Sequence, residues 1–161
     1  MLPTGGGNGC RSADNRCRGR GWNHPRPGDG LMGSERLELA AVNTSGSVLR
    51  RKVTDRLVQL RLDEQSAGDF GLAVTEAFSN AVSHGTGAPE AKIHASLQFR
   101  PGQASVTLVY PGDPFPTTTP ELPSLWATAG RGRYLMTTLA DQVDYEFADG
   151  ITRVRLVKRW Q

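Results

Sequence analysis

Apolar residues follow two different periods in the first part of the patterned sequence. RLELAAV at 36–42 alternates loosely between apolar and polar positions, as a β-strand does. Apolar residues then recur every three or four positions, which predicts an amphipathic helix from Val48 to Leu62 with Ser45 or Ser47 as its N-cap. The apolar positions of this helix are Val48, Leu49, Val53, Leu57 and Leu60.

A second helix follows the interruption DEQSAGD at 63–69. Asp69 is placed to cap it, and the apolar spacing carries it to about Ser83. Gly85 and Gly87 end it, since glycine commonly stops helices. The predicted core stripe of this helix consists of Phe70, Val74, Ala77, Phe78 and Ala81.

The C-terminal half of the chain predicts two β-hairpins. Residues 91–99 and 104–110 alternate on either side of the turn sequence RPGQ. Residues 141–147 and 151–159 flank Asp149-Gly150, a favoured hairpin turn pair.

An irregular stretch separates the two hairpins. Residues 111–130 contain five prolines, and a short helix is expected directly after them, over RGRYLMTTLA. A loop of this length inside a compact domain is usually functional or mobile. The predicted order β-α-α-β-β-loop-α-β-β indicates an α+β two-layer sandwich. We expect a mixed, mostly antiparallel sheet of about five strands, with three helices on one face.

The first 33 residues differ in composition from the rest. They hold five Arg, two Asp and 9 of the 19 glycines, with few aliphatic side chains, so they are predicted to be a disordered Gly/Arg-rich tail or the product of a misassigned start. Residues 34–161 carry fourteen basic and fourteen acidic residues, so we expect one neutral domain there and no binding to nucleic acid. Cys10 and Cys17 have no second Cys or His pair that would complete a zinc site.

The chain carries no run of about 20 apolar residues and no apolar centre of a secretory signal at its start. We therefore expect a cytoplasmic protein without a membrane segment.

Three short motifs carry possible chemistry. Glu76, Asn80 and His84 are four residues apart, so a helix would align them beside its core stripe. An amide oxygen is a hard ligand that suits Mg²⁺, and a carboxylate can accept a proton from an attacking hydroxyl. Taken alone, this pair is also explained by an ordinary polar helix face.

The other two motifs contain glycine. YPGDPF at 110–115 follows a strand, and its Pro114 and Phe115 could form a flat wall for a purine. GRGRYLM at 130–136 places two glycines before a helix start, where backbone N–H groups bind phosphate. Each has an ordinary alternative, a proline-rich strand exit and a loop end respectively.

The three motifs in this order resemble the anti-sigma-factor serine/threonine kinases, which are ATP-binding proteins of the GHKL superfamily. The resemblance rests on EAFSNAVSHG, YPGDPF and GRGRYLM and covers about residues 35–160. It implies the Bergerat fold of that family, an α/β sandwich, with the irregular stretch as the ATP lid.

The resemblance also implies roles for individual residues. Glu76 corresponds to the general base that activates a serine hydroxyl, and Asn80 to the Mg²⁺ ligand that bridges the ATP phosphates. The positions of the adenine and phosphate boxes correspond to Tyr110, Gly112, Phe115, Gly130, Arg131 and Gly132. The implied cofactors are ATP and Mg²⁺. The implied partners are a STAS-type anti-anti-sigma protein and a sigma factor, and a homodimer is a further candidate assembly.

One position departs from the family pattern. The family usually has Asp two residues before the first-box glycine, where its carboxylate binds the adenine amino group, and this chain has Tyr110. Losing a charge-assisted hydrogen bond would cost roughly 1.5–3 kcal/mol, or about one to two decades of affinity. The kinase hypothesis therefore stands beside two alternatives: a protein-interaction switch of the same fold with weak or absent catalysis, and an unrelated α+β protein.

Overall fold

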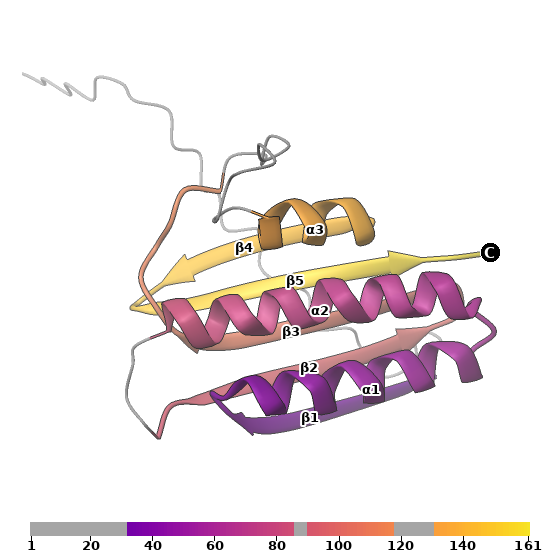
Figure 1. The fold of residues 1–161 in the computed structure, drawn as a ribbon, viewed down its shortest axis with the longest axis horizontal. Coiled ribbons are helices and arrows are strands. Elements are labelled where there is room, and N and C mark those ends of the chain that lie inside the picture. Colours follow the sequence, from indigo (N-terminus) through magenta and orange to yellow (C-terminus); the bar gives the residue numbers. More distant parts are fainter. Residues whose placement is uncertain (1–31, 86–89, 118–130) are drawn as a thin grey trace, which may run out of the picture.

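The computed structural model describes residues 32–85, 90–117 and 131–161. The predicted order of five strands and three helices is confirmed (Figure 1). The elements are β1 (Gly33–Ala40), α1 (Asn43–Gln59), α2 (Glu64–His84), β2 (Lys92–Arg100), β3 (Gln103–Pro111), α3 (Arg131–Leu139), β4 (Gln142–Ala148) and β5 (Ile151–Arg159).

The five strands form one sheet in the order β1-β2-β3-β5-β4. All four pairings are antiparallel, whereas a mixed sheet was expected. The reason is that β5, and not β4, lies next to β3. The strand that follows α3 therefore sits at the far edge, and the last strand returns between it and β3.

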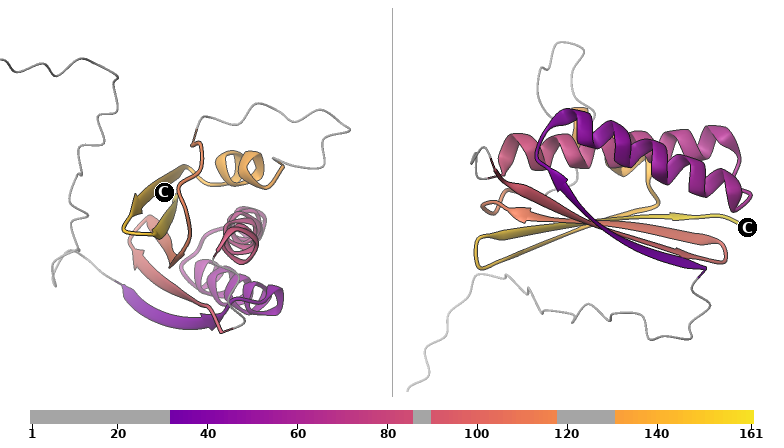
Figure 2. Two further views of the ribbon diagram at one scale, coloured as in Figure 1. Left: turned by 90° about the vertical axis from the view of Figure 1, so that its left-hand side faces the viewer. Right: turned by 90° about the horizontal axis from the view of Figure 1, so that it is seen from below.

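The three helices cover one face of the sheet (Figure 2). Strand β3 shows how the sequence selects this face, because Ala104, Val106, Leu108 and Tyr110 are buried while Thr107 and Val109 between them are only partly covered. This alternation of side chains is the period of two that a strand imposes.

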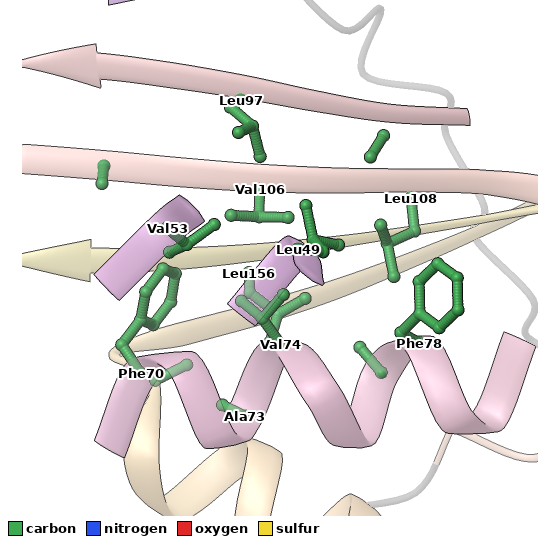
Figure 3. Packing of buried hydrophobic residues seen from close by; sticks show 14 of the residues in the cluster. Leu49, Val53, Phe70, Ala73, Val74, Phe78, Leu97, Val106, Leu108 and Leu156 are labelled. Atoms are coloured by element: carbon green, nitrogen blue, oxygen red, sulfur yellow. The ribbon is translucent and has the colours of Figure 1, made fainter. Parts of the chain in front are cut away.

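The core lies between helix α2 and the sheet (Figure 3). All five residues of the predicted stripe of α2 are buried, which confirms that prediction. Leu49 and Val53 of α1 meet Val106 and Leu156 of the sheet in the same layer. Full burial of a Leu, Val or Phe side chain contributes about 1.5–3 kcal/mol, so this stripe fixes the rotation of α2 about its own axis.

The N-terminus of α1 differs from the prediction. The helix starts at Asn43 after Val42, whose side chain makes no capping hydrogen bond, so Ser45 and Ser47 lie inside the helix and do not cap it. Val48 is exposed, and the face that turns inward begins instead at Gly46, on which the Phe78 ring rests. Tertiary packing here extends the helix past the residues that local propensity favours as caps.

The end of α1 is a Schellman motif without glycine. Arg61 takes a left-handed conformation with φ of 69°. The Leu62 N–H donates to the Leu57 carbonyl at 3.1 Å, and the Arg61 N–H donates to the Val58 carbonyl at 3.0 Å. This tight ending leaves Asp63 free to start the next helix at once.

Helix α2 is capped by Asp63, and the prediction of Asp69 as its cap is wrong. The Asp63 carboxylate accepts from the Ser66 N–H at 2.8 Å, and this hydrogen bond lowers the Asp63 pKa. Asp69 lies in the second turn, where it accepts from the Gln65 side chain at 3.0 Å. The helix therefore begins six residues earlier than the sequence suggested, and the DEQSAGD segment is mostly helical.

Replacing Asp63 with Ala is expected to lower the melting temperature at pH 7 by a few degrees, because the cap hydrogen bond is lost. Asp69→Ala is the matched control and should shift it less. The folded-state pKa of Asp63 is lowered, so the stabilisation is present above the usual carboxylate pKa and is lost as the pH falls through the lowered value. Circular dichroism melts of both variants from pH 2 to pH 7 test this, and equal shifts for the two variants would contradict the assignment of the cap.

Candidate functional site

Glu76, Asn80 and His84 form a polar strip on α2, which lies beside the buried apolar residues of the same helix. Glu76 and Asn80 are half-buried, and His84 at the end of the helix is exposed. Helix α3 lies beside α2 (Figure 1), and Glu76 and Asn80 of the strip lie close to Gly132 in its first turn. The sequence spacing therefore delivers an acid and an amide, one turn apart, to the boundary between two helices.

The first turn of α3 meets this strip. A Cβ atom added at Gly132 would lie 2.7 Å from the Glu76 Oε2 atom and 3.8 Å from the Asn80 Oδ1 atom. Glycine is thus the residue that lets the α3 backbone approach both polar side chains. The N-terminus of a helix carries a partial positive charge and unpaired N–H groups, which suit an anion. Arg131 is the exposed first residue of α3, and Gly130 lies outside the described residues.

The end of α2 is joined to the end of β3. Gly85 and Gly112 form an isolated antiparallel bridge. Gly85 has φ of −66°, so it is not a left-handed cap of the kind expected from the sequence. A larger residue than glycine does not fit at position 85, since a Cβ atom there would lie 2.5 Å from the Ala81 carbonyl oxygen. Gly87, the second predicted helix stop, lies outside the described residues.

Hydrogen bonds from the second hairpin fix Gly112. Its N–H donates to the Gly150 carbonyl at 3.0 Å, and its carbonyl accepts from the buried Thr152 hydroxyl at 3.1 Å. Asp149 and Gly150 have φ of 52° and 72°, the left-handed conformations that the predicted turn pair favours. The hairpin turn and the YPGDPF motif are therefore one connected structure.

Tyr110 points to the helix-covered face of the sheet. Its residue is 3 % exposed, and burial raises the pKa of its hydroxyl to about 12, with a smaller contribution from Tyr145. The register places Tyr110 of β3, Thr152 of β5 and Phe147 of β4 in one row across the sheet. A neutral, aromatic side chain thus occupies the position where the resemblance led us to expect a carboxylate.

Phe115 lies on an aromatic pair from β4. Its ring makes edge contacts with Tyr145 at 5.3 Å and Phe147 at 4.9 Å between ring centroids. The Arg133 guanidinium carbon lies 5.8 Å from the centre of the Phe115 ring. Burial raises the pKa of Tyr145, and the charge and hydrogen bond of Arg133 oppose this increase.

Sequence reasoning missed three residues of this region, namely Tyr145, Phe147 and Thr152, whereas Arg133 lies within the GRGRYLM motif. The alternation in β4 contained a usable signal, because Tyr145 and Phe147 share the parity of Val143, which packs on the core. Nothing in the sequence indicated that β4 and β5 would bring them to Phe115 and Tyr110.

The side-chain oxygens of this site are compatible with a magnesium ion whose coordination is completed by phosphate and water. Among the described residues no three His, Cys, Asp or Glu side chains gather into a metal site. Mg²⁺ typically takes one or two protein oxygens and leaves the rest to water and phosphates, so Asn80 beside Glu76 suits such an ion better than a fully protein-bound one.

Two further observations concern other parts of the described structure. A cavity of about 410 Å³ lies between β1, β2 and α1, lined by residues such as Glu35, Lys52 and Arg56, and it shares no residue with the site around Glu76. Of the helices in the described parts of the chain, none is both long and apolar enough to cross a membrane.

The two site glycines are expected to respond differently to alanine. Gly85→Ala meets a backbone carbonyl that cannot withdraw, so it should lower the free energy of unfolding by about 1–3 kcal/mol. Gly132→Ala meets the flexible end of Glu76, which can swing away, so its effect should stay below about 1 kcal/mol. Urea denaturation of both variants tests this difference, and an equal or larger loss for Gly132→Ala would contradict the described contact.

Two solved structures resemble this one. The RsbU and RsbW domains of Rv1364c from Mycobacterium tuberculosis match with 18% identity and a TM-score of 0.59, over 79% of this chain and 32% of that chain. The histidine kinase domain of the blue-light activated histidine kinase from Erythrobacter litoralis EL346 matches with 20% identity and a TM-score of 0.48, over 61% of this chain and 46% of that chain. This chain therefore spans about a third of the first structure, and at 18% identity the likeness shows a shared fold.

A family model covers most of the sequence. No curated protein matches the chain. The model described as histidine kinase-like ATPase domain matches residues 39–158, which contain both site helices and four of the five strands almost completely. The chain therefore belongs to the family of histidine kinase-like ATPase domains.

Proposed function

We propose that this protein is an ATP-dependent serine kinase of the anti-sigma-factor type. In this proposal it phosphorylates a STAS-type anti-anti-sigma partner and, in another state, sequesters a sigma factor. The observation that carries the proposal is the meeting of Glu76, Asn80 and Gly132 at the boundary of α2 and α3.

Glu76 is suited to the role of general base. Its carboxylate is half-buried beside the N-terminus of α3, so it lies at the proposed phosphate end of the site and is still reachable by a partner hydroxyl. Accepting the serine proton as the oxygen attacks phosphorus is the task that a positioned carboxylate performs in phosphoryl transfer.

Asn80 and the first turn of α3 are suited to the phosphates. When bound, Mg-ATP supplies the phosphoryl group and neutralises part of the charge that develops on it. Asn80 offers an uncharged oxygen to the metal, while Gly132 lets backbone N–H groups approach phosphate oxygens. Arg131 adds positive charge at the same helix end.

The adenine base of the nucleotide would lie on the side of the site where Phe115 is found. Phe115 provides a flat ring fixed on β4, and Gly112 keeps the strand exit narrow against Tyr110 and Thr152. The proposed partners rest on the resemblance of the three motifs and on the fold shared with a protein that contains an RsbW domain. A homodimer stays a prediction.

A second candidate is a protein-interaction switch of the same fold that binds nucleotide weakly or not at all. Tyr110 favours it, because this side chain is packed into the core where a carboxylate was expected. Calorimetric titration with Mg-ATP separates the two. Low-micromolar binding that depends on Asn80 supports the kinase, whereas millimolar or undetectable binding supports the switch.

Asn80→Ala is expected to weaken Mg-ATP binding by roughly tenfold or more, because a metal ligand worth about 1–3 kcal/mol is removed. Ser79→Ala is the control, since adjacent helix residues face different directions. Calorimetry on both variants provides the measurement. An unchanged affinity for Asn80→Ala, with parental binding intact, would remove Asn80 from the site.

Glu76→Gln keeps the size of the side chain and removes its basicity. We expect phosphate transfer to the STAS-type partner to fall by about 10²-fold or more, while ATP affinity changes little. Mass spectrometry of the partner after single-turnover incubation measures the transfer, with Asp69→Asn as a control acid on the same helix. Transfer as fast as in the parent would show that Glu76 is not the base.

A further inference from the structure

Phe115 is held in place by side-chain contacts, because it lies beyond the end of a strand. Strand β3 ends at Pro111, and residues 113–117 have no regular secondary structure. The Phe115 ring rests on two nearly parallel rings of β4, with centroid distances of 5.3 Å to Tyr145 and 4.9 Å to Phe147. Each edge contact of this kind adds only a modest stabilisation, so the position of the ring depends on a small number of contacts.

Arg133 packs against the same ring. Its guanidinium carbon lies 5.8 Å from the centre of the Phe115 ring, which is a cation–π distance, and its side chain is hydrogen-bonded to Tyr145. The Nε atom of Arg133 is fully enclosed, so this side chain is packed into the cluster and is not extended into solvent. Arg133 therefore connects helix α3 to a ring of the strand exit and to a phenol of β4.

Arg133 follows Gly132 directly but faces a different part of the site. Successive residues of a helix point about 100° apart. Gly132 lies against Glu76, at the proposed phosphate end, whereas Arg133 lies against Phe115, at the proposed base end. A role for Arg133 in binding phosphate would require its guanidinium to leave both Phe115 and Tyr145.

We propose that Arg133 is a positioning residue, which holds the Phe115 ring on β4 and thereby raises the affinity of the site for the base of the nucleotide. The inference rests on the proposed nucleotide site and adds to it the residue that organises its base end. A ring that is fixed before the ligand arrives removes part of the ordering cost of binding, so Arg133 need not touch the base. Phe115 is only half-buried, so part of its ring stays open to a ligand.

The first measurement concerns the ring alone and needs no nucleotide. In proton NMR spectra of the full chain, the ring currents of Tyr145 and Phe147 should displace the signals of the Phe115 ring. Arg133→Met keeps a long, flexible side chain and removes the guanidinium, so these signals should move at least halfway toward those of an unstructured phenylalanine. Unchanged ring signals would overturn the positioning role.

The second measurement separates the base from the phosphates. NMR titrations with adenosine, Mg-tripolyphosphate and Mg-ATP give three dissociation constants. Arg133→Met should weaken adenosine and Mg-ATP by the same factor, about threefold to thirtyfold, and should leave tripolyphosphate within about twofold of the parent. Arg131→Met removes a charge from the same helix turn and should show the opposite pattern, a weaker tripolyphosphate with little change for adenosine.

Two milder variants test the individual contacts. Arg133→Lys keeps the charge but lacks the planar guanidinium, so it should lose nearly as much adenosine affinity as the Met variant, and full rescue by Lys would contradict the role. Tyr145→Phe removes only the hydroxyl, so it should weaken adenosine less and add nothing in the Arg133→Met background. Circular dichroism melts establish that each variant is folded. If Arg133→Met does not fold, the Lys and Tyr145→Phe variants still decide the matter.

Different outcomes separate this inference from the proposed function. If the parent binds Mg-ATP in an Asn80-dependent manner but Arg133→Met weakens tripolyphosphate and not adenosine, Arg133 is a phosphate ligand, and its positioning role falls while the nucleotide site stands. A variant that is less stable but binds adenosine like the parent would show a purely structural contact and would also overturn the role. If the parent binds none of the three ligands, both proposals fall.

Discussion

Burial of one face of α2 is the constraint on which the rest of this structure depends. Phe70, Val74 and Phe78 are completely buried against the sheet, and α1 packs on the same layer. A helix held along three turns by such contacts can neither roll nor slide without opening cavities in a close-packed interior. The polar strip beside that face therefore has a fixed direction, and α3 meets it at Gly132.

The sequence was most informative where one local rule decides the structure. Alternation and turn chemistry predicted both hairpins, and helical spacing predicted the buried stripe of α2 and the strip that carries Glu76 and Asn80. Helix ends were harder to predict. The first residue of α1 depends on the packing of Gly46, and α2 can begin at Asp63 because α1 ends in a tight turn that closes on Leu57. Neither helix begins at the serine or aspartate that the sequence suggested as its cap. Local propensity is a weak prior when tertiary contacts compete with it.

The aromatic side of the site could not be predicted because it depends on strand order. Tyr145 and Phe147 reach Phe115, and Phe147 joins the row of Tyr110, only because β5 lies between β3 and β4. Alternation shows which face a residue occupies but not which strand is its neighbour. The role of Gly85 was likewise hidden, since a glycine required by a nearby carbonyl looks the same in a sequence as one required by a positive φ.

The division of α2 into a buried stripe and a polar strip has an evolutionary consequence. Changes at Glu76 or Asn80 touch residues that are only half-buried, so they should leave the stripe, and with it the fold, largely intact. Selection can thus retain the scaffold while catalysis weakens, is lost or is replaced by another use of the same surface. In such a lineage, membership of the family is a durable trait and chemistry a changeable one.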